Sequence, residues 1–269
     1  MPDPIESPPL EGVVADQRIR HLTRRSFVTG GVAALAGLGA WRWLGSATPE
    51  DGVPWPLRRL LGLNQSLVEG IGMPRGLAPT FSAESIRGAS RINGLVGLSH
   101  EVDGSSWQLT VQHENRGIVQ SIPLRDVQAL PRLELVTEFK CVEGWSEVMQ
   151  FSGIRFLDFV THFRLATRSG RTPDPAGNAQ DLFRYVYLAT PDETYYVGLD
   201  IASALHPQTL LSDTINGVPL SRAHGAPLRL YLAVKYGFKS LKRVGLVRFT
   251  DARPADYWAD RGYDWYAGL

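Results

Sequence analysis

The feature that most constrains the fold is a succession of short apolar runs, which begins near residue 86 and continues to residue 250. Apolar and polar residues alternate within the runs, and β-branched and aromatic residues are frequent, which favours β-strands. The strand candidates are residues 91–98, 106–113, 133–141, 184–190, 194–201, 210–220, 228–234 and 244–250. The best helix candidates are residues 153–166 and 198–205, so the sequence predicts a mixed, strand-rich α+β fold.

Two Asn-Gly dipeptides, Asn93-Gly94 and Asn216-Gly217, lie within these runs. Both residue types tolerate the positive φ that tight turns require, so each dipeptide predicts a β-hairpin. Residues 168–181 are polar and rich in Gly and Pro, which predicts a surface loop. Residues 256–269 are rich in Tyr and Trp, and these rings either cover an edge of the core or form a surface for a partner protein.

Composition narrows the classes of ligand. The chain has 269 residues, and the 43% that are hydrophobic suffice for a sizeable core. A formal net charge of +1 gives the molecule no overall field that would attract nucleic acid, so we expect no nucleic-acid partner. An anionic ligand would have to be held by a local cluster of cations.

Cys141 is the only cysteine of the chain. A single thiol excludes an internal disulfide and every zinc or iron–sulfur site built from several cysteines of this chain. Cys141 is therefore a buried apolar residue without chemistry, a lone metal ligand or a nucleophile.

The N-terminal residues have the layout of an export signal. Arg24 and Arg25 precede an apolar run rich in Gly and Ala, residues 27–41, and the order Thr-Arg-Arg-Ser-Phe-Val resembles the twin-arginine (Tat) consensus. A buried helix is the alternative, but the glycines of the run disfavour it. We expect export to the periplasm, with residues 1–47 as a signal that is either cleaved or kept as an anchor. Residues 48–85 would form an extended arm, and residues 86–269 the functional domain.

Three motifs in order resemble a known family. The stretch FKCVEGWS, residues 139–146, is similar to the cysteine motif of molybdopterin-dependent oxidoreductases with the sulfite-oxidase-type fold. Residues 200–230 and 234–249 resemble two further stretches of that family. The similarity is greatest to the branch that contains the periplasmic protein-methionine-sulfoxide reductase catalytic subunit, and it extends from about residue 64 to residue 250. It implies a sulfite-oxidase-type molybdopterin-binding fold.

The resemblance gives Cys141 a function. In this family a pyranopterin dithiolene and one protein cysteine together hold molybdenum through sulfur, the soft donor that suits such a centre. Cys141 would be the protein ligand. If residues 141–143 are extended, Glu143 points the same way as Cys141 and could transfer protons during catalysis. A solvated glutamate, or one paired with an arginine, is the alternative for Glu143.

The resemblance also implies a binding site for the pterin phosphate. His224 and Arg229 flank a Gly-Ala-Pro turn at the family's phosphate position, and Ser240, Leu241 and Lys242 add a cation, a hydroxyl and backbone N–H groups. Taken singly, each of these residues could equally be an ordinary surface or turn residue. In the family's order they predict a binding cluster.

Two further positions match the family more weakly. Thr190 and Asn64 correspond to residues that hydrogen-bond the pterin, although Thr190 could simply end a strand and Asn64 could cap a helix. The sequence also departs from the methionine-sulfoxide branch, which usually has Asn at position 224 and Pro-Trp at positions 233–234. His224 is typical of the sulfite-oxidising branch, but the arginines that follow the cysteine in that branch are absent from residues 144–146.

These observations predict an exported molybdenum–molybdopterin oxidoreductase that transfers an oxygen atom, with reduction of a small-molecule or peptide-bound S-oxide such as methionine sulfoxide favoured. Oxidation of sulfite and a catalytically silent cofactor-binding protein of the envelope are the alternatives. The sequence has no haem motif and no iron–sulfur cysteine set, so electrons would come from a separate partner, which the family suggests is a membrane b-type cytochrome.

Overall fold

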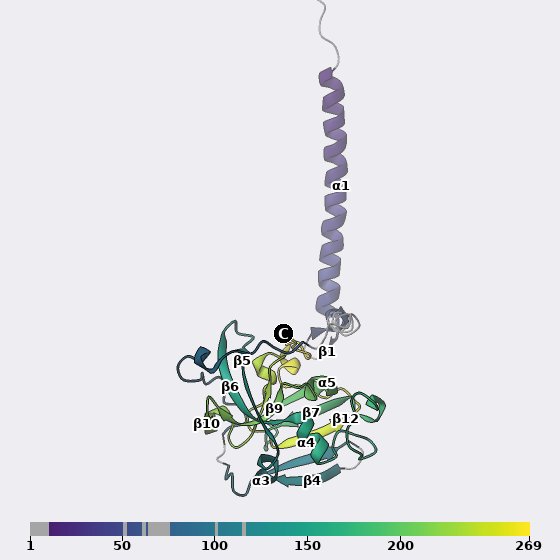
Figure 1. Cartoon of the computed structure of the whole chain (residues 1–269). Helices are drawn as coiled ribbons and strands as arrows, with labels where there is room; N and C mark the ends of the chain where they lie inside the picture. Colours follow the sequence, from purple (N-terminus) through teal and green to yellow (C-terminus); the bar gives the residue numbers. More distant parts are fainter. Residues whose placement is uncertain (1–10, 51–52, 61–62, 64–75, 100–101, 115–116) are drawn as a thin grey trace, which may run out of the picture. The chain divides into compact units, whose positions relative to one another are not determined.

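The computed structural model describes residues 11–50, 53–60, 63, 76–99, 102–114 and 117–269 (Figure 1). The chain separates into two compact units, residues 1–60 and residues 61–269. The boundaries predicted at residues 47 and 85 separate a signal, an arm and a functional domain. They depend on the functions expected of these three segments, and they stay predictions.

The N-terminal unit is built around one long helix, α1 (Glu11–Ser46), which contains the twin-arginine motif. It is followed by two short antiparallel strands, β1 (Pro49–Glu50) and β2 (Val53–Pro54). The rings of Trp43 and Trp55 meet edge to face, with their centroids 5.8 Å apart. Among the described residues, no helix combines the length and the apolar character that crossing a membrane requires.

The C-terminal unit contains two five-stranded sheets. In the first, here the β6 sheet, the order is β10 (Val218–Pro219), β9 (Thr209–Ile215), β6 (Ser146–Arg155), β5 (Arg132–Lys140), and β11 (Arg229–Leu232) also pairs with β9. All of its pairs are antiparallel. The strands β5 and β6 form a hairpin, and its turn carries the cysteine.

The second sheet, here the β12 sheet, has the order β4 (Gly117–Pro123), β3 (Gln108–His113), β12 (Leu246–Thr250), β7 (Tyr185–Ala189), β8 (Tyr196–Asp200). Its only parallel pair among the described strands is β12 with β3. This pair places the last described strand of the unit beside the first.

The helices of this unit that lie wholly within the described residues are short. They are α3 (Leu124–Gln128), α4 (Phe156–His162) and α5 (Ile201–Ala204). The carboxylate of Asp200 caps α5 by accepting a hydrogen bond from the Ser203 N–H at 2.8 Å. Single 3₁₀ turns, η1 to η5, lie at Ala83–Ser85, Ala179–Asp181, Arg222–His224, Gly237–Lys239 and Ala259–Arg261.

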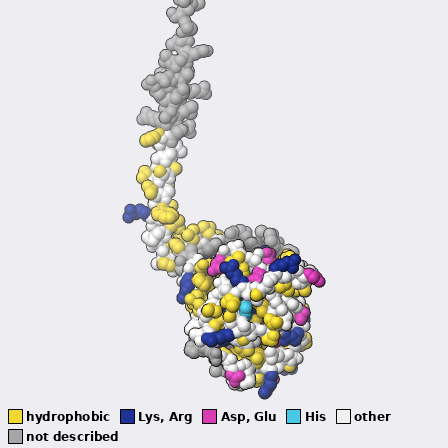
Figure 2. All heavy atoms as spheres, turned by 90° about the vertical axis from the view of Figure 1, so that its left-hand side faces the viewer, with side chains coloured by type: hydrophobic (Ala, Val, Ile, Leu, Met, Phe, Trp, Pro, Cys, Tyr) yellow, Lys and Arg dark blue, Asp and Glu magenta, His cyan; other side chains and the backbone are white. Residues whose placement is uncertain are grey.

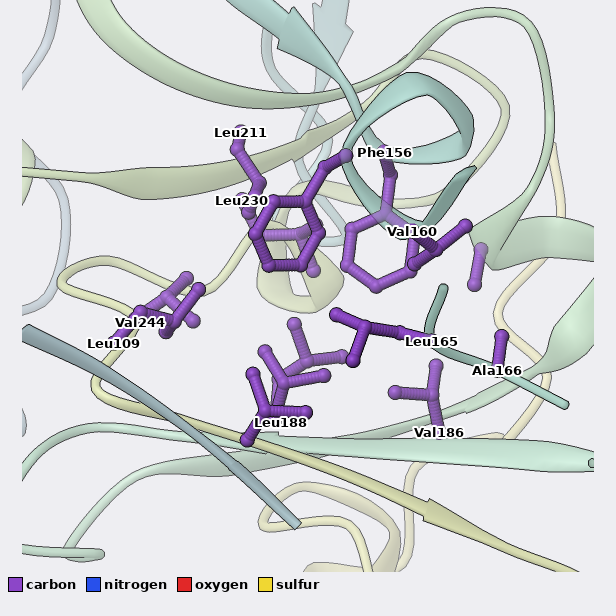
Figure 3. Close-up of a cluster of buried hydrophobic side chains, with 14 of the residues drawn as sticks. Leu109, Phe156, Val160, Leu165, Ala166, Val186, Leu188, Leu211, Leu230 and Val244 are labelled. Atoms are coloured by element: carbon purple, nitrogen blue, oxygen red, sulfur yellow. The ribbon is translucent and has the colours of Figure 1, made fainter. Parts of the chain in front are cut away.

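The main core lies where the two sheets and α4 meet. Phe156 and Val160 of α4, Leu188 of the β12 sheet, and Leu211 and Leu230 of the β6 sheet belong to one cluster of buried side chains (Figure 3). The β6 sheet is buried on both faces, because Leu211 faces this core while its neighbour Leu210 packs into a second cluster with Phe151 and Tyr231. Phe151 also lines the cavity described below. Seen from the side of β5, β6 and β10, the surface mixes acidic, basic and apolar side chains (Figure 2).

The structure confirms most of the predicted elements and corrects others. The Asn216-Gly217 turn joins β9 to β10, with φ of 48° and 77° at its two residues. The prediction of a strand over 91–98 with a hairpin at Asn93-Gly94 is wrong, because those residues form no strand. Strands β4 and β6 were not predicted, and the helix expected over 153–166 begins only at Phe156 because the preceding residues end β6.

Candidate active site

A cavity of about 990 Å³, including the part open to solvent, lies within the C-terminal unit, in the size range of sites for small ligands and cofactors. Its wall comes from segments that are far apart in the sequence. The lining residues are Arg91, Asn93, Gly94, Val96, Phe139, Cys141, Val142, Glu143, Trp145, Met149, Phe151, Tyr195, Arg229, Gly237, Phe238, Ser240, Lys242, Trp258 and Tyr263.

Cys141 begins the turn between β5 and β6. Its N–H donates to the Trp145 carbonyl at 2.9 Å, and the Gly144 N–H donates back to the Cys141 carbonyl at 3.1 Å. Gly144 has φ of 88°, which favours glycine. The turn therefore fixes the thiol on the cavity wall, where only 8% of the residue is exposed.

The surroundings of the thiol favour its neutral form. Burial is the largest influence and raises the pKa of Cys141 above its ordinary value; the backbone N–H of Glu143 lowers this pKa and the carboxylate of Glu143 raises it. The side-chain amide of Asn93 acts in the opposite direction by donating to Sγ at 3.6 Å. A thiolate here would thus need a strong positive partner, and a metal ion that displaces the proton supplies one.

Glu143 lies on the cavity wall, but not for the expected reason. Residues 142–143 form a turn, so the premise of an extended segment is wrong. The exposed carboxylate accepts a hydrogen bond from the Trp145 indole N–H at 3.1 Å. The Trp145 ring stacks with Phe139, with the two centroids 5.9 Å apart, and the guanidinium of Arg91 lies 4.7 Å from its centroid.

Arg229 is a buried cation on the cavity wall. The residue is 3% exposed, and its Nη1 and Nη2 donate to the carbonyls of His224 and Ser240 at 3.2 and 3.4 Å. Its Nε is buried without a hydrogen-bond partner, and no carboxylate of the described residues pairs with it. Burial lowers the pKa of Arg229 to about 10, which still leaves the guanidinium charged at neutral pH. An unpaired buried cation of this kind is costly unless an anion joins it.

Lys242, which lines the cavity, and His224, which is not among the lining residues, both lie close enough to Arg229 to feel its charge. The Lys242 ammonium donates to the carbonyls of Asn93 and Gly94 at 2.5 and 2.9 Å, and burial together with the charge of Arg229 lowers its pKa to about 8. The Nδ1 of His224 pairs with the Ser221 hydroxyl at 2.8 Å, whereas its Nε2 is buried without a partner. Burial, and then the charge of Arg229, lowers the pKa of His224.

The remaining predicted residues are placed differently. Ser240 lines the cavity, while its neighbour Leu241 is buried in the main core. Thr190 is fully buried and is not among the lining residues; its hydroxyl donates to Asp192 at 2.6 Å and accepts from the Tyr195 N–H at 3.2 Å, as expected where a strand ends. Asn64 lies outside the described residues. The roles of Thr190 and Asn64 in cofactor binding stay predictions.

The C-terminal segment closes one side of the cavity. Trp258 and Tyr263 belong to the lining, and so does Phe238 from the turn at η4. The adjacent Lys239 anchors the two segments to each other, because its ammonium donates to Asp256 at 2.6 Å with both side chains fully buried. The cavity wall thus depends on a buried ion pair behind it.

Sequence reasoning missed Arg91, Asn93, Tyr195, Phe238, Trp258 and Tyr263 as members of the site. A weak signal existed for the last two in the aromatic composition of residues 256–269, for which covering the core edge and docking a partner were the alternatives considered. Trp265 is buried and follows the first of these alternatives. Phe238 lies within the third family motif, and Arg91, Asn93 and Tyr195 are brought to the cavity by tertiary folding alone.

Comparison with known proteins assigns the chain to a protein family. Residues 96–258, well over half of the chain, match the model of the oxidoreductase molybdopterin-binding domain. The chain belongs to this family. Its members bind molybdopterin and are oxidoreductases, which confirms the predicted family, the strand-rich α+β fold class and an enzymatic function.

Relatives within the molybdopterin oxidoreductases carry more specific names. The chain is 31% identical over 254 residues to a candidate protein-methionine-sulfoxide reductase subunit, YedZ1, of Azospira oryzae, covering 93% of this chain and 87% of that protein. It is 35% identical over 130 residues to the protein-methionine-sulfoxide reductase catalytic subunit MsrP of Xanthomonas campestris, covering 47% of this chain and 39% of MsrP. The sulfane dehydrogenase SoxCD of Paracoccus pantotrophus superposes with a TM-score of 0.47 at 15% identity, over 58% of this chain and 41% of that one.

Proposed function

We propose that the chain is an exported molybdenum–molybdopterin oxidoreductase that reduces S-oxides, methionine sulfoxide among them. The observation that carries this proposal is the pairing, on one cavity wall, of the lone Cys141 thiol with the buried and unpaired guanidinium of Arg229. The names of the relatives from Azospira and Xanthomonas support the choice of an S-oxide.

The residues of the cavity fit the proposed cofactor. A soft thiol suits molybdenum, and the orphaned Nε of Arg229 suits the phosphate of a pterin, since a guanidinium binds phosphate through several N–H groups at once. Cys141 would hold the metal, and Arg229 with Lys242 would hold the phosphate. When bound, the group supplies the site for oxygen-atom transfer.

The protein's own contribution is to orient the reactants and to move protons. Reduction of an S-oxide breaks the S–O bond, consumes two electrons and two protons, and releases a sulfide and water. Glu143 lies on the cavity wall with its carboxylate hydrogen-bonded to Trp145, where it could pass a proton to the departing oxygen. The electrons would come from a membrane b-type cytochrome.

The proposal is tested with purified protein isolated from the periplasm. We expect about one molybdenum atom per chain and a paramagnetic signal on partial reduction. With reduced methyl viologen as electron donor, the protein should convert methionine sulfoxide to methionine. Oxidation of sulfite in place of sulfoxide reduction would contradict the proposed direction. Absence of molybdenum would contradict the proposal as a whole.

Replacing Arg229 by lysine is expected to lower the molybdenum content of the purified protein. Lysine keeps the charge but cannot make the several N–H contacts that the planar guanidinium of arginine makes with a phosphate. Cofactor binding should therefore weaken by about 1.5–3 kcal/mol. The matched control is Arg125→Lys, because Arg125 is an exposed residue of α3. Protein that retains molybdenum should give the native signal, since Cys141 is unchanged. Equal metal content in both variants, with equal resistance to loss on dilution, would contradict the phosphate assignment.

Replacing Arg24 and Arg25 together by lysine is expected to leave folded, cofactor-loaded protein in the cytoplasm. The charge is conserved, but the paired-guanidinium signal is lost. Cell fractionation measures the distribution. Arg18 and Arg20 provide the control, because they precede the signal and are not adjacent to each other, so lysine at those positions should not alter export. Normal arrival of the Arg24→Lys, Arg25→Lys protein in the periplasm would contradict a twin-arginine signal.

A further inference from the structure

The aromatic side of the cavity has no part in the chemistry assigned above. Phe238, Trp258 and Tyr263 form one contiguous group, with ring centroids 5.7 Å apart for Phe238 and Tyr263 and 5.0 Å apart for Trp258 and Tyr263. Both contacts are edge to face, and all three residues line the cavity. Tyr263 is 37% exposed, so the group borders both the cavity and solvent.

We propose that this group, the Phe238/Trp258/Tyr263 subsite, binds an apolar substituent on the sulfur of the S-oxide and so selects substrates by that substituent. This inference rests on the proposed function and adds the determinant of its specificity. An exposed apolar ring surface gains free energy by covering an apolar group, and the sulfur of such a substrate can itself contact a ring. A small dianion such as sulfite would gain nothing from these rings and would lose hydration beside them.

The subsite is fixed in place, as selectivity requires. Lys239 follows Phe238 directly, and Asp256 precedes Trp258 by two residues, so the buried Lys239–Asp256 ion pair ties together the two segments that carry the rings. The Asp256 carboxylate also accepts a hydrogen bond from the Trp258 N–H at 3.1 Å, and the Tyr263 N–H donates to the Trp258 carbonyl at 3.0 Å. Rings held in this way can distinguish substituents by shape as well as by apolar area.

The test compares methyl p-tolyl sulfoxide with dimethyl sulfoxide as substrates of the holoenzyme, with reduced methyl viologen as donor. Removing a well-packed apolar wall weakens selection by about tenfold or more. We therefore expect Trp258→Ala to lower kcat/KM for the aryl sulfoxide about tenfold more than it lowers kcat/KM for dimethyl sulfoxide. Trp258→Phe should restore part of the selectivity. The control is Tyr187→Ala, because Tyr187 lies on β7 and is not a lining residue.

A binding measurement separates this inference from the proposed function. Methyl phenyl sulfone and dimethyl sulfone serve as analogues that are not sulfoxides and are not expected to turn over. Calorimetry of the holoenzyme therefore measures their binding affinities alone. The wild type should prefer the phenyl compound, and Trp258→Ala and Tyr263→Leu should each lose that preference. An unchanged preference in both variants, together with an unchanged ratio of kcat/KM values, would overturn the subsite. If neither sulfoxide is reduced by the wild type, the proposed function fails, while the sulfone affinities still decide on the subsite.

Discussion

Replacing Cys141 by serine is expected to abolish turnover and to change the spectrum of the metal centre. A hydroxyl is a harder donor than a thiol and far less acidic, so it is a poor ligand for a metal in a sulfur-rich environment. The loss of activity should be at least about a hundredfold, the upper end of what loss of a supporting ligand contact causes. Metal analysis, the visible spectrum and the paramagnetic signal after partial reduction provide the measurement.

A second outcome checks that the fold is not the cause. The residue is 8% exposed and serine is close to it in size, so Cys141→Ser should retain a native far-ultraviolet spectrum and a similar melting temperature. Arg229 and Lys242 are unchanged, so some pterin should remain bound. Full turnover with unchanged visible and paramagnetic spectra would contradict the assignment of Cys141 as the metal ligand.

The Asp256→Asn variant is expected to lose about 3–5 kcal/mol of unfolding free energy, because it leaves the Lys239 ammonium buried without its counter-charge. The two side chains are fully buried and lie 2.6 Å apart. Urea denaturation of purified protein measures the loss. The exposed Arg155–Asp158 pair has a similar separation of 2.7 Å and serves as the control: Asp158→Asn should cost no more than about 1 kcal/mol.

A double variant sharpens this prediction. Lys239→Met combined with Asp256→Asn removes the uncompensated charge, so it should recover a large part of the stability lost in the single variant. If Asp256→Asn were no more destabilised than Asp158→Asn, the ion pair could not be the anchor between the two segments that carry Phe238 and Trp258.

The local parts of this fold could be predicted from the sequence, and the parts that depend on distant contacts could not. The Asn216-Gly217 hairpin was predicted correctly because residues on both sides of it pair with each other. Asn93-Gly94 has the same turn chemistry, but its carbonyls accept hydrogen bonds from Lys242 and its side chain reaches Cys141, so tertiary contacts replace the hairpin. Strand β6 escaped prediction because it runs directly into α4 with no breaker between them.

The same distinction holds for the site. Cys141, Glu143, Arg229, Ser240 and Lys242 belong to motifs that are contiguous in sequence, and all five line the cavity. Of the rings that complete the wall, Trp258 and Tyr263 lie outside these motifs, and Phe238 lies within the third. Phe238 meets Trp258 and Tyr263 where a buried ion pair joins their segments, and a partner so distant in sequence gives no periodic signal.

The scattered origin of the cavity wall has a consequence for the order of events in the cell. Its members run from Arg91 to Tyr263, and the ribosome makes them in that order, after it has made Arg24 and Arg25. While residue 263 is still unmade, one side of the cavity is missing and an inserted pterin would have no complete enclosure. If Arg24 and Arg25 form the proposed export signal, that signal is complete long before the cavity is. Export that began at once would move a chain without its cofactor, so the proposed function requires synthesis, folding and cofactor insertion to finish before export.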